Sequence, residues 1–360
     1  MKNWAGGAPP LIKMFSIYEQ LDALLKAQGR LLEAGGVGPE ESPYRVVLEG
    51  PVYRLRDYGG GESGPVILVV PAPIKKAYLW DLFPESSVIR RLLRGGFRVF
   101  LIEWKAPGPG HDELGLSEYA GSFILNCFDK ISGYAGEENC FLVGHSLGGT
   151  LAAIFSSYRP ERIKGLVLAA GPVHFGAGVG CLDTAVALFG GLRDVVGIFG
   201  NVPGSFLDVV ATGADPETFF FYPLRDLMES MEDSGAMRTH LAVRRWMLDE
   251  TPLPKKLFKE VVELLYRDDV FMRGLLKLDG SSASPERIDF PVLAIIDRDC
   301  RIVTPRSVLP FFEKIKSTDT QVLWYAGDKG ILFRHAGVLV GKNAQGKIWP
   351  EVVSWIQARS

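Results

Sequence analysis

Residues 140–158 of this 360-residue chain spell CFLVGHSLGGTLAAIFSSY, and this stretch decides the fold. The short apolar run at 140–143 predicts a buried strand, and residues 149–158 predict a helix. Between them lies a G-x-S-x-G motif centred on Ser146. A serine at so sharp a strand-to-helix turn occupies strained backbone, and small residues two positions away on either side let strand and helix approach closely. The motif in this context predicts a nucleophile.

The turn also predicts what surrounds the nucleophile. It presents the Ser146 hydroxyl at the carboxyl edge of the sheet and aims the backbone N–H of Leu147, at a helix N-terminus, toward a developing oxyanion. A second N–H is expected from residues 72–74, and Ile74 is our candidate. The alternative is an ordinary serine in a glycine-rich turn.

A serine hydroxyl is a weak nucleophile until a base accepts its proton. Three histidines follow Ser146: His174, His240 and His335. Only His335 comes after the last expected strand, where the base belongs in this chain order. The alternative for His335 is a histidine of a surface loop.

The acid that would orient the imidazole is less well defined. Asp297 and Asp299 both lie just past the expected strand at 292–296. Either could hold the imidazole and stabilise its protonated form. We prefer Asp299 and keep Asp297 as the substitute; the alternative is that both are solvated turn residues.

Around this motif, strand and helix patterns alternate. The run VILVV at 66–70 is continuously apolar, as expected of a strand covered on both faces. Such alternation predicts an α/β fold with a mostly parallel central sheet and helices on both faces. The expected strands are 45–48, 52–55, 66–70, 97–102, 140–143, 165–169, 292–296 and 321–325, and the expected helices of this part are 87–93, 116–131, 149–158 and 350–356.

The alternation stops at about Gly171 and resumes near Pro291. The segment between is rich in helix formers and aromatic residues, which indicates an inserted helical cap. An amphipathic helix at 15–32 precedes the sheet. We therefore expect an N-terminal helical extension at 1–40, a first core part at 41–171, the cap at 172–288 and a second core part at 289–360.

Composition limits the function classes. With 40 basic and 42 acidic residues, nothing favours a nucleic-acid partner. The four cysteines show no metal-ligand or disulfide spacing, and no apolar run is long enough to span a membrane. Acyl transfer through a serine needs no metal or organic cofactor. We expect a cytoplasmic enzyme without a cofactor.

Beyond these shared features, the chain resembles the catalytic subunit of class III-type polyhydroxyalkanoate synthases, which belong to the α/β-hydrolase superfamily. The resemblance runs across most of the length, and it implies hydroxyacyl esters, polyesters or acyl-CoA thioesters as substrates and a homodimer or a second synthase subunit as partner. Substrate contacts are expected from Trp104, His145 and Trp246. The similar segments are YLWDLFPE at 78–85, VFLIEW at 99–104, GNVP at 200–203, WMLDETP at 246–252 and HAGV at 335–338.

Two positions depart from that family. Its nucleophile is a cysteine, and this chain has Ser146 there. Serine forms a more stable ester intermediate and depends wholly on its base, which is more typical of hydrolysis. In an alignment without gaps from Pro291, the family aspartate falls on Cys300, one residue after Asp299.

Three hypotheses follow. The first is a serine-dependent acyl hydrolase or acyltransferase built on a synthase-like scaffold. The second is a true polyhydroxyalkanoate synthase subunit that polymerises 3-hydroxyacyl-CoA with serine. The third is a catalytically silent synthase-like scaffold, which only the irregular acid loop favours.

Overall fold

The structure is a computed structural model of the chain. It describes residues 10–61, 64–176, 178–188, 199–329, 331 and 333–360. Residues 1–9 of the expected N-terminal extension and 189–198 of the expected cap therefore lie outside the described residues.

An eight-stranded sheet forms the centre of the molecule, in the order β1-β2-β6-β3-β7-β8-β13-β14. The six strands from β6 to β14 pair in parallel, and β1 and β2 form an antiparallel hairpin at one edge. The strands are β1 (Arg45–Glu49), β2 (Tyr53–Asp57), β3 (Val66–Val70), β6 (Arg98–Trp104), β7 (Cys140–His145), β8 (Ile163–Ala169), β13 (Val292–Asp297) and β14 (Thr320–Tyr325).

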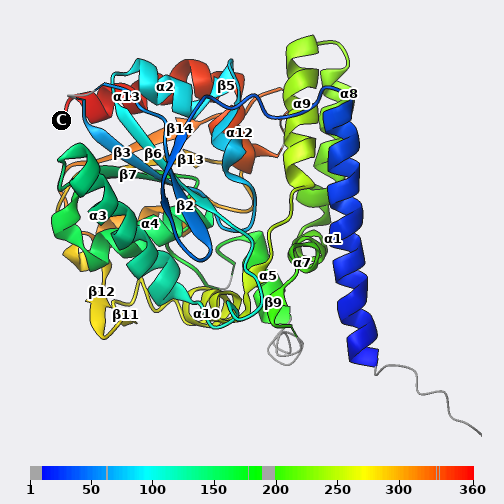
Figure 1. Ribbon diagram of the computed structural model, residues 1–360, viewed down its shortest axis with the longest axis horizontal. Coiled ribbons are helices and arrows are strands. Elements are labelled where there is room, and N and C mark those ends of the chain that lie inside the picture. Colours follow the sequence, from blue (N-terminus) through cyan, green and yellow to red (C-terminus); the bar gives the residue numbers. More distant parts are fainter. Residues whose placement is uncertain (1–9, 62–63, 177, 189–198, 330, 332) are drawn as a thin grey trace, which may run out of the picture.

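Helices cover both faces of this sheet (Figure 1). All five residues of β3 and all six of β7 are buried, as the apolar runs at 66–70 and 140–143 predict. On one face lie α2 (Val88–Arg94) and α13 (Trp349–Gln357), and on the other lie α3 (Phe123–Ala135) and α4 (Leu147–Tyr158). Smaller elements of this part are η1 (Ala77–Trp80), β4 (Asp81–Phe83), β5 (Ser86–Ser87), η2 (Glu118–Ser122), η3 (Pro160–Arg162), η7 (Pro305–Ser307), α11 (Leu309–Lys314), α12 (Arg334–Val340) and η8 (Ala344–Ile348).

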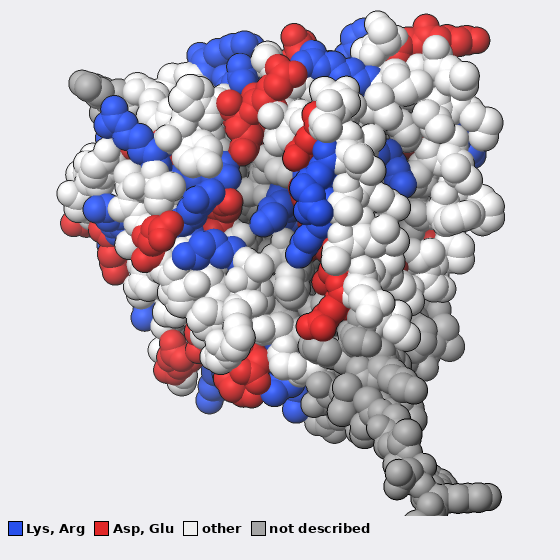
Figure 2. Space-filling view, turned by 45° about the vertical axis from the view of Figure 1, so that its right-hand side comes forward, with Lys and Arg blue, Asp and Glu red and all other residues white. Residues whose placement is uncertain are grey.

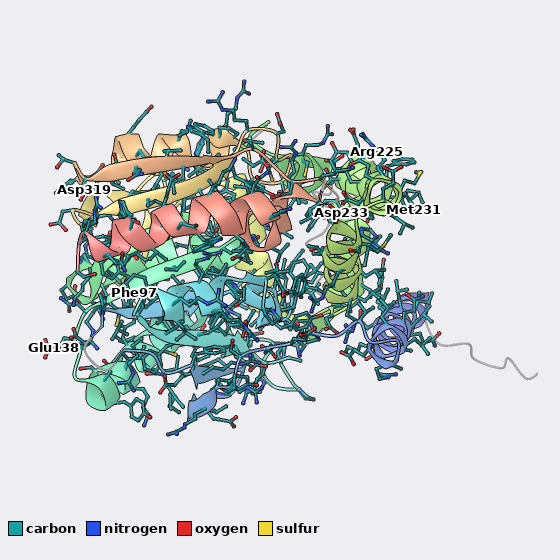
Figure 3. All side chains as sticks on the ribbon, turned by 90° about the horizontal axis from the view of Figure 1, so that it is seen from above. Phe97, Glu138, Arg225, Met231, Asp233 and Asp319 are labelled. Carbon is teal, nitrogen blue, oxygen red and sulfur yellow. The ribbon has the colours of Figure 1, made fainter. Side chains whose placement is uncertain are left out.

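The chain between β8 and β13, which we call the insertion, adds no strand to the large sheet in the part that the structure describes. Its α8–α9 hairpin projects from the sheet layer. In Figure 3, the end of the hairpin that carries Met231 and Asp233 lies on the other side of the molecule from Asp319 and Glu138. Its elements are α5 (Cys181–Leu188), β9 (Asn201–Val202), α7 (Gly204–Ala214), η4 (Glu217–Phe221), α8 (Tyr222–Ser230), α9 (Ser234–Met247), β10 (Leu253–Pro254), α10 (Lys255–Glu260), η5 (Val261–Arg267), β11 (Leu276–Leu278), β12 (Ser281–Ala283) and η6 (Pro285–Arg287).

The long first helix, α1 (Pro10–Ala34), packs along α7 and α9 at the outer side of the insertion (Figure 1). Tyr18 packs against Phe199 and Phe206, and Asp22 accepts a hydrogen bond from the Ser205 N–H at 2.8 Å. This helix therefore supports the insertion and does not cover the sheet.

The predicted α/β fold, with a mostly parallel sheet, is confirmed. The strand at 66–70 has the predicted bounds, and the first helix is longer than predicted at both ends. Two helices, α11 and α12, were not predicted. The domain boundaries at 40, 171 and 288 stay predictions. No helix among the described residues is long and apolar enough to cross a membrane.

Candidate active site

Ser146 sits between the end of β7 and the start of α4, with φ 56° and ψ −136°. Positive φ is unfavourable for a residue with a side chain, so the surrounding structure must hold this conformation in place. The Ser146 carbonyl accepts hydrogen bonds from the N–H groups of Gly149 and Thr150, and the Ser146 N–H donates to the Ala169 carbonyl at 3.2 Å. The serine is therefore fixed by both its own helix and the neighbouring strand.

Three glycines make this turn sterically feasible. A Cβ atom on Gly144 would lie 2.6 Å from the Cα atom of Gly149, and one on Gly149 would lie 2.8 Å from the Cα atom of Gly171. A Cβ atom on Gly148 would lie 2.2 Å from the Val70 carbonyl oxygen. Because all these neighbours are backbone atoms, no side-chain movement could relieve the clashes. The small residues that the sequence shows around Ser146 are thus required by close backbone approach.

Ser146 meets His335, as the chain order predicts. The Nε2 atom of His335 lies 2.8 Å from the Ser146 Oγ atom. His335 is buried near the start of α12, on the segment that follows β14. Burial lowers the pKa of His335 well below its usual value, so the imidazole is neutral and can accept the serine proton near neutral pH.

His145, expected to contact substrate, lines the same cavity but also holds the base. Its Nε2 atom lies 2.8 Å from the His335 backbone oxygen. Because a carbonyl only accepts hydrogen bonds, Nε2 of His145 must carry the proton. The two imidazole rings lie 4.7 Å apart, and burial lowers the pKa of His145 to about 4. A neutral His145 thus anchors the backbone of the base, a role that the sequence analysis missed.

The expected acid does not contact the base. Asp299 has 72% of its side chain exposed and pairs with Arg334 Nη1 at 3.1 Å. Asp297 is buried, and both its carboxylate oxygens also accept from Arg334, at 3.1 and 3.2 Å. Among the described residues, the Nδ1 atom of His335 is buried without a hydrogen-bond partner. The expected position of Asp299 beside the imidazole is therefore corrected: Asp299 and Asp297 both pair with Arg334, the residue before His335, and neither is hydrogen-bonded to the imidazole.

Cys300, at the position of the family aspartate, does not replace it. The thiol is buried, and its sulfur accepts a hydrogen bond from the Val303 N–H at 3.4 Å. Burial raises the pKa of Cys300 to about 11. A neutral thiol in this position cannot stabilise an imidazolium as a carboxylate does.

Ser146 and His335 open into a cavity of about 230 Å³. Trp246 lines it as expected, and its Nε1 atom donates to the Lys76 carbonyl at 2.8 Å. Trp104 is not among the lining residues; its Nε1 atom donates to the Pro71 carbonyl at 2.7 Å instead, which corrects its expected contact with substrate. Most of the lining is apolar and comes from the insertion, including Leu207, Val210, Phe219, Phe258, Val261 and Tyr266.

The expected oxyanion donors lie at this cavity. Leu147 is the first residue of α4, so its N–H has no acceptor within the helix. Ile74 and Ala72 lie after β3, and both line the cavity with Leu147. Pro73 between them has no N–H, so Ala72 and Ile74 are the two donors that this loop can offer. The structure thus brings Leu147 and Ile74 to the same cavity as Ser146.

One face of the molecule carries charges of both signs. Figure 2 shows Lys and Arg side chains interleaved with Asp and Glu over the face turned to the viewer. Within the described part of the chain, no group of three or more His, Cys, Asp or Glu residues is arranged to hold a metal ion. The groups that the structure brings together at the cavity are the Ser146 hydroxyl, the His335 imidazole and the chain at Leu147, Ala72 and Ile74.

Sequence comparisons relate this chain to a known fold family and to known enzyme subunits. Residues 65–193 match the family described as alpha/beta hydrolase fold. Over 346 residues the chain is 29% identical to the poly(3-hydroxyalkanoate) polymerase subunit PhaC of Haloferax mediterranei, covering 95% of this chain and 69% of that protein. It is 26% identical over 329 residues to the PhaC subunit of Allochromatium vinosum, covering 90% of each.

Solved structures support the fold. The monoacylglycerol lipase of Paleococcus ferrophilus aligns with a TM-score of 0.53 at 19% identity, covering 86% of this chain and 99% of that one. The naproxen esterase of Bacillus subtilis aligns with a TM-score of 0.53 at 14% identity, covering 93% and 98%. This protein has the α/β-hydrolase fold and is similar, over most of its length, to the PhaC subunits of poly(3-hydroxyalkanoate) polymerases.

Proposed function

We propose that this protein is a serine-dependent acyl hydrolase or acyltransferase acting on hydroxyacyl esters, polyesters or acyl-CoA thioesters. The observation that carries the proposal is the 2.8 Å contact between Ser146 Oγ and His335 Nε2, at an apolar cavity that also contains Leu147 and Ile74. A strained serine, a neutral imidazole and free backbone N–H groups are the parts that acyl transfer needs.

In the proposed mechanism, Ser146 Oγ attacks the carbonyl carbon while its proton passes to His335 Nε2. The carbonyl oxygen becomes an oxyanion, which accepts hydrogen bonds from the Leu147 N–H and from the Ala72 or Ile74 N–H. When the tetrahedral intermediate collapses, the imidazolium protonates the leaving thiolate or alkoxide, and an acyl-serine ester remains. His335 then removes a proton from water or from an acceptor hydroxyl, which attacks the ester and releases Ser146.

The sequence predicts Asp299 as the acid that orients the His335 imidazole, with Asp297 as its substitute. Arg334 pairs with both carboxylates, and His335 Nδ1 has no hydrogen-bond partner among the described residues. We therefore propose that the Ser146–His335 pair carries the chemistry in the arrangement seen here.

A second candidate function is polymerisation of 3-hydroxyacyl-CoA. The observation that favours it is the similarity to PhaC polymerase subunits over 90% or more of the chain. In this case the hydroxyl group of a growing chain, not water, would attack the acyl-serine. Serine in place of the family cysteine argues for the first candidate, because an oxygen ester is a less reactive acyl donor than a thioester.

One assay separates these two functions. Purified protein receives 3-hydroxybutyryl-CoA, CoA release is measured, and the products are separated into free acid and polymer. Free 3-hydroxybutyrate at the rate of CoA release is the expected result, and the Ser146→Ala protein should release none. Accumulating polymer would contradict the hydrolase proposal and establish the second candidate.

The silent-scaffold hypothesis is tested with a fluorophosphonate probe, which reacts with activated serines. We expect the folded protein to label once, at Ser146, and the His335→Ala protein to lose labelling. An intact, folded wild-type protein that does not label would support the scaffold instead.

The remaining expectations also belong to the proposal. We place the protein in the cytoplasm, where acyl-CoA substrates occur, and we expect a homodimer or a complex with a second subunit. Light scattering on the purified chain tests this: a mass of one chain that does not change with concentration would rule out the homodimer.

A further inference from the structure

One end of the otherwise apolar cavity carries a charged cluster that the proposed mechanism does not use. It consists of Lys75, Glu250 and Asp208, all of which line the cavity. The Lys75 ammonium donates to the Met247 carbonyl at 2.6 Å, contacts the Glu250 carboxylate and lies 3.5 Å from Asp208 Oδ1. These three partners account for the three protons of the ammonium group.

The Lys75–Glu250 pair is mostly withdrawn from water. The Lys75 side chain is 13% exposed and that of Glu250 is 2% exposed. Burial lowers the pKa of Lys75. Removing two charges from water costs about as much as their attraction returns, so such a pair adds little net stability compared with apolar side chains of similar size. A role in fixing geometry accounts for the pair better than a role in stability.

The pair joins the loop at 72–76, which offers the Ala72 and Ile74 N–H groups, to the insertion. Lys75 follows Ile74 directly and forms an isolated antiparallel bridge with Glu250. Next to this bridge, the Thr251 N–H donates to the Ile74 carbonyl at 3.2 Å. The loop that offers the Ala72 and Ile74 N–H groups thus lies along the chain that leaves α9.

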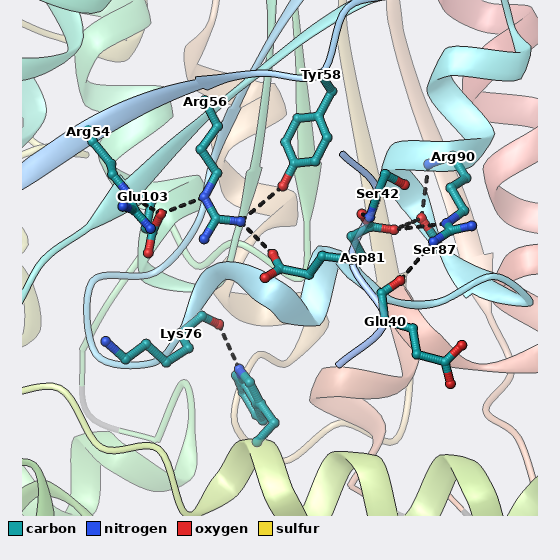
Figure 4. Close-up of polar contacts among 12 residues, drawn as sticks. Glu40, Ser42, Arg54, Arg56, Tyr58, Lys76, Asp81, Ser87, Arg90 and Glu103 are labelled. Atoms are coloured by element: carbon teal, nitrogen blue, oxygen red, sulfur yellow. Dashed lines mark hydrogen bonds and ion pairs between the residues drawn. The ribbon is translucent and has the colours of Figure 1, made fainter. Parts of the chain in front are cut away.

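Two further contacts extend this junction. The Lys76 carbonyl accepts from the Trp246 indole, a contact drawn in Figure 4, and Tyr78 Oη donates to Asp249 Oδ2 at 2.8 Å. Glu250 itself is held from the other side by α7, because a Cβ atom on Gly204 would lie 2.4 Å from the Glu250 Cβ atom. Glu250 therefore has little freedom to shift.

The segment at 71–81, which contains this loop, is anchored on the core at both of its ends. At the start, Trp104 donates to the Pro71 carbonyl. At the far end, buried Asp81 accepts from the Ser42 N–H, from Ser87 Oγ and from Arg90 Nε, as Figure 4 shows. Between these anchors, the hydrogen bonds that the structure gives residues 74–76 lead to the insertion, so the insertion sets where the Ile74 N–H lies.

We propose that Lys75 and Glu250 are positioning residues for the oxyanion site. Their ion pair holds the loop at 72–76 so that the Ile74 N–H group reaches the oxyanion together with the Leu147 N–H group. The pair takes no part in bond making. This inference rests on the proposed acyl transfer through Ser146, and it identifies the insertion as part of the catalytic apparatus and not only as a cover over the cavity.

The test compares Glu250→Gln and Lys75→Met with a control, Arg238→Gln. Arg238 also joins α9 to the core, through Glu40 at 2.6 Å and Glu85 at 3.0 Å, but this pair is exposed and away from the cavity. Each protein is measured for kcat and KM on a p-nitrophenyl ester, for the rate of fluorophosphonate labelling, and for affinity to an alkylboronic acid that forms a tetrahedral adduct on Ser146.

Loss of an oxyanion donor lowers kcat by about 10²- to 10³-fold, so a displaced donor should lower kcat by about 10- to 100-fold. We expect this loss in both pair variants, with KM changed by less than about 3-fold and with boronic acid affinity and labelling rate reduced by a similar factor to kcat. Glu250→Asp should recover part of the loss, and Arg238→Gln should match the wild type.

A double variant, Lys75→Met with Glu250→Met, guards against misfolding, because it removes both charges of the buried pair and leaves only the Asp208 carboxylate, 42% exposed, without its partner. It should keep the wild-type melting temperature and still lose kcat. Unchanged kcat and boronic acid affinity in this folded double variant would overturn the positioning role while leaving the proposed function intact. No labelling of folded wild-type protein would overturn both.

Discussion

The elbow around Ser146 and the loop around Asp299 both follow strands of the same sheet, but they are held in different ways. At the elbow, backbone atoms of Val70, Gly149 and Gly171 leave no room for a side chain at the three neighbouring glycines. At the acid loop, Asp299 is exposed, and its side chain is held by Arg334, which lies 35 positions later in the chain. The first arrangement follows from local sterics and the second from a long-range ion pair.

This difference bears on how each region tolerates change. A strained turn surrounded by backbone has one arrangement, so a substitution there acts on the whole elbow. An ion pair that is largely exposed on one side is worth little energy and can exchange partners. The elbow should therefore be sensitive to substitution and constant in geometry, whereas the acid loop should be tolerant and able to rearrange.

The largest effect should come from the elbow and its base. Ser146→Ala removes the nucleophile and His335→Ala removes the base, and each should lower kcat/KM by about 10⁴-fold or more. Because the two residues act as a unit, the double variant should be no worse than either single one. Steady-state kinetics on the best ester substrate measures this. Losses that multiply in the double variant would contradict the joint role.

A smaller but still large effect is expected at Gly148. A Cβ atom there would lie 2.2 Å from the Val70 oxygen and 2.4 Å from the Pro71 carbonyl carbon. Gly148→Ala should therefore cost about 3 kcal/mol of unfolding free energy, at the upper end for overpacking. Urea denaturation gives the value. The matched control is Gly133→Ala in α3, where no atom lies within 4 Å of the new Cβ; a loss there as large as that at Gly148 would refute the steric argument.

His145, whose imidazole is hydrogen-bonded to the His335 backbone, should make the free energy of unfolding depend on pH. His145 is buried and neutral with a pKa of about 4, below its usual 6.5. As pH falls below about 6.5 the unfolded chain binds this proton first, so stability is complete above that pH and is lost as pH falls toward 4. The shift corresponds to about 3 kcal/mol.

His145→Gln tests this directly, because glutamine can still donate to the His335 carbonyl but does not titrate. Urea denaturation between pH 4 and pH 7 should show a flatter pH dependence for this variant than for the wild type. His335 is also buried with a pKa lowered by burial and by the neighbouring His145, so the difference between the two proteins includes the effect of His145 on His335. Parallel pH curves would show that His145 does not contribute.

The smallest effect is expected at the acid loop. Asp299→Asn removes one exposed partner of Arg334, so kcat/KM should fall by less than about 3-fold. Asp297→Asn, which also breaks a buried ion pair, should cost more stability than activity. Kinetics and melting temperatures of both variants are the measurement. A loss near 10⁴-fold in either would mean that its carboxylate reaches His335 Nδ1 during catalysis.

Sequence patterns predicted the parts of the site that depend on local order. The strand-turn-helix around Ser146, the choice of His335 among three histidines and the strands of the sheet all follow from periodicity and chain order. The short helix α12, which carries His335, was missed, since its seven residues, RHAGVLV, include a glycine, and the phenylalanine before them offers no side-chain cap. Arg334 beside His335 was visible in the sequence, but nothing marked its partners.

The sequence by itself therefore determined the α/β fold, the strand-turn-helix around Ser146 and the position of His335 after the last strand, because glycine spacing and strand patterns act over a few residues. Only the tertiary structure decided that Arg334 holds both carboxylates, that His145 holds the base and that Lys75 meets Glu250. These contacts join residues 37, 190 and 175 positions apart, and pairing over such distances depends on how the packed elements meet, which no local pattern encodes.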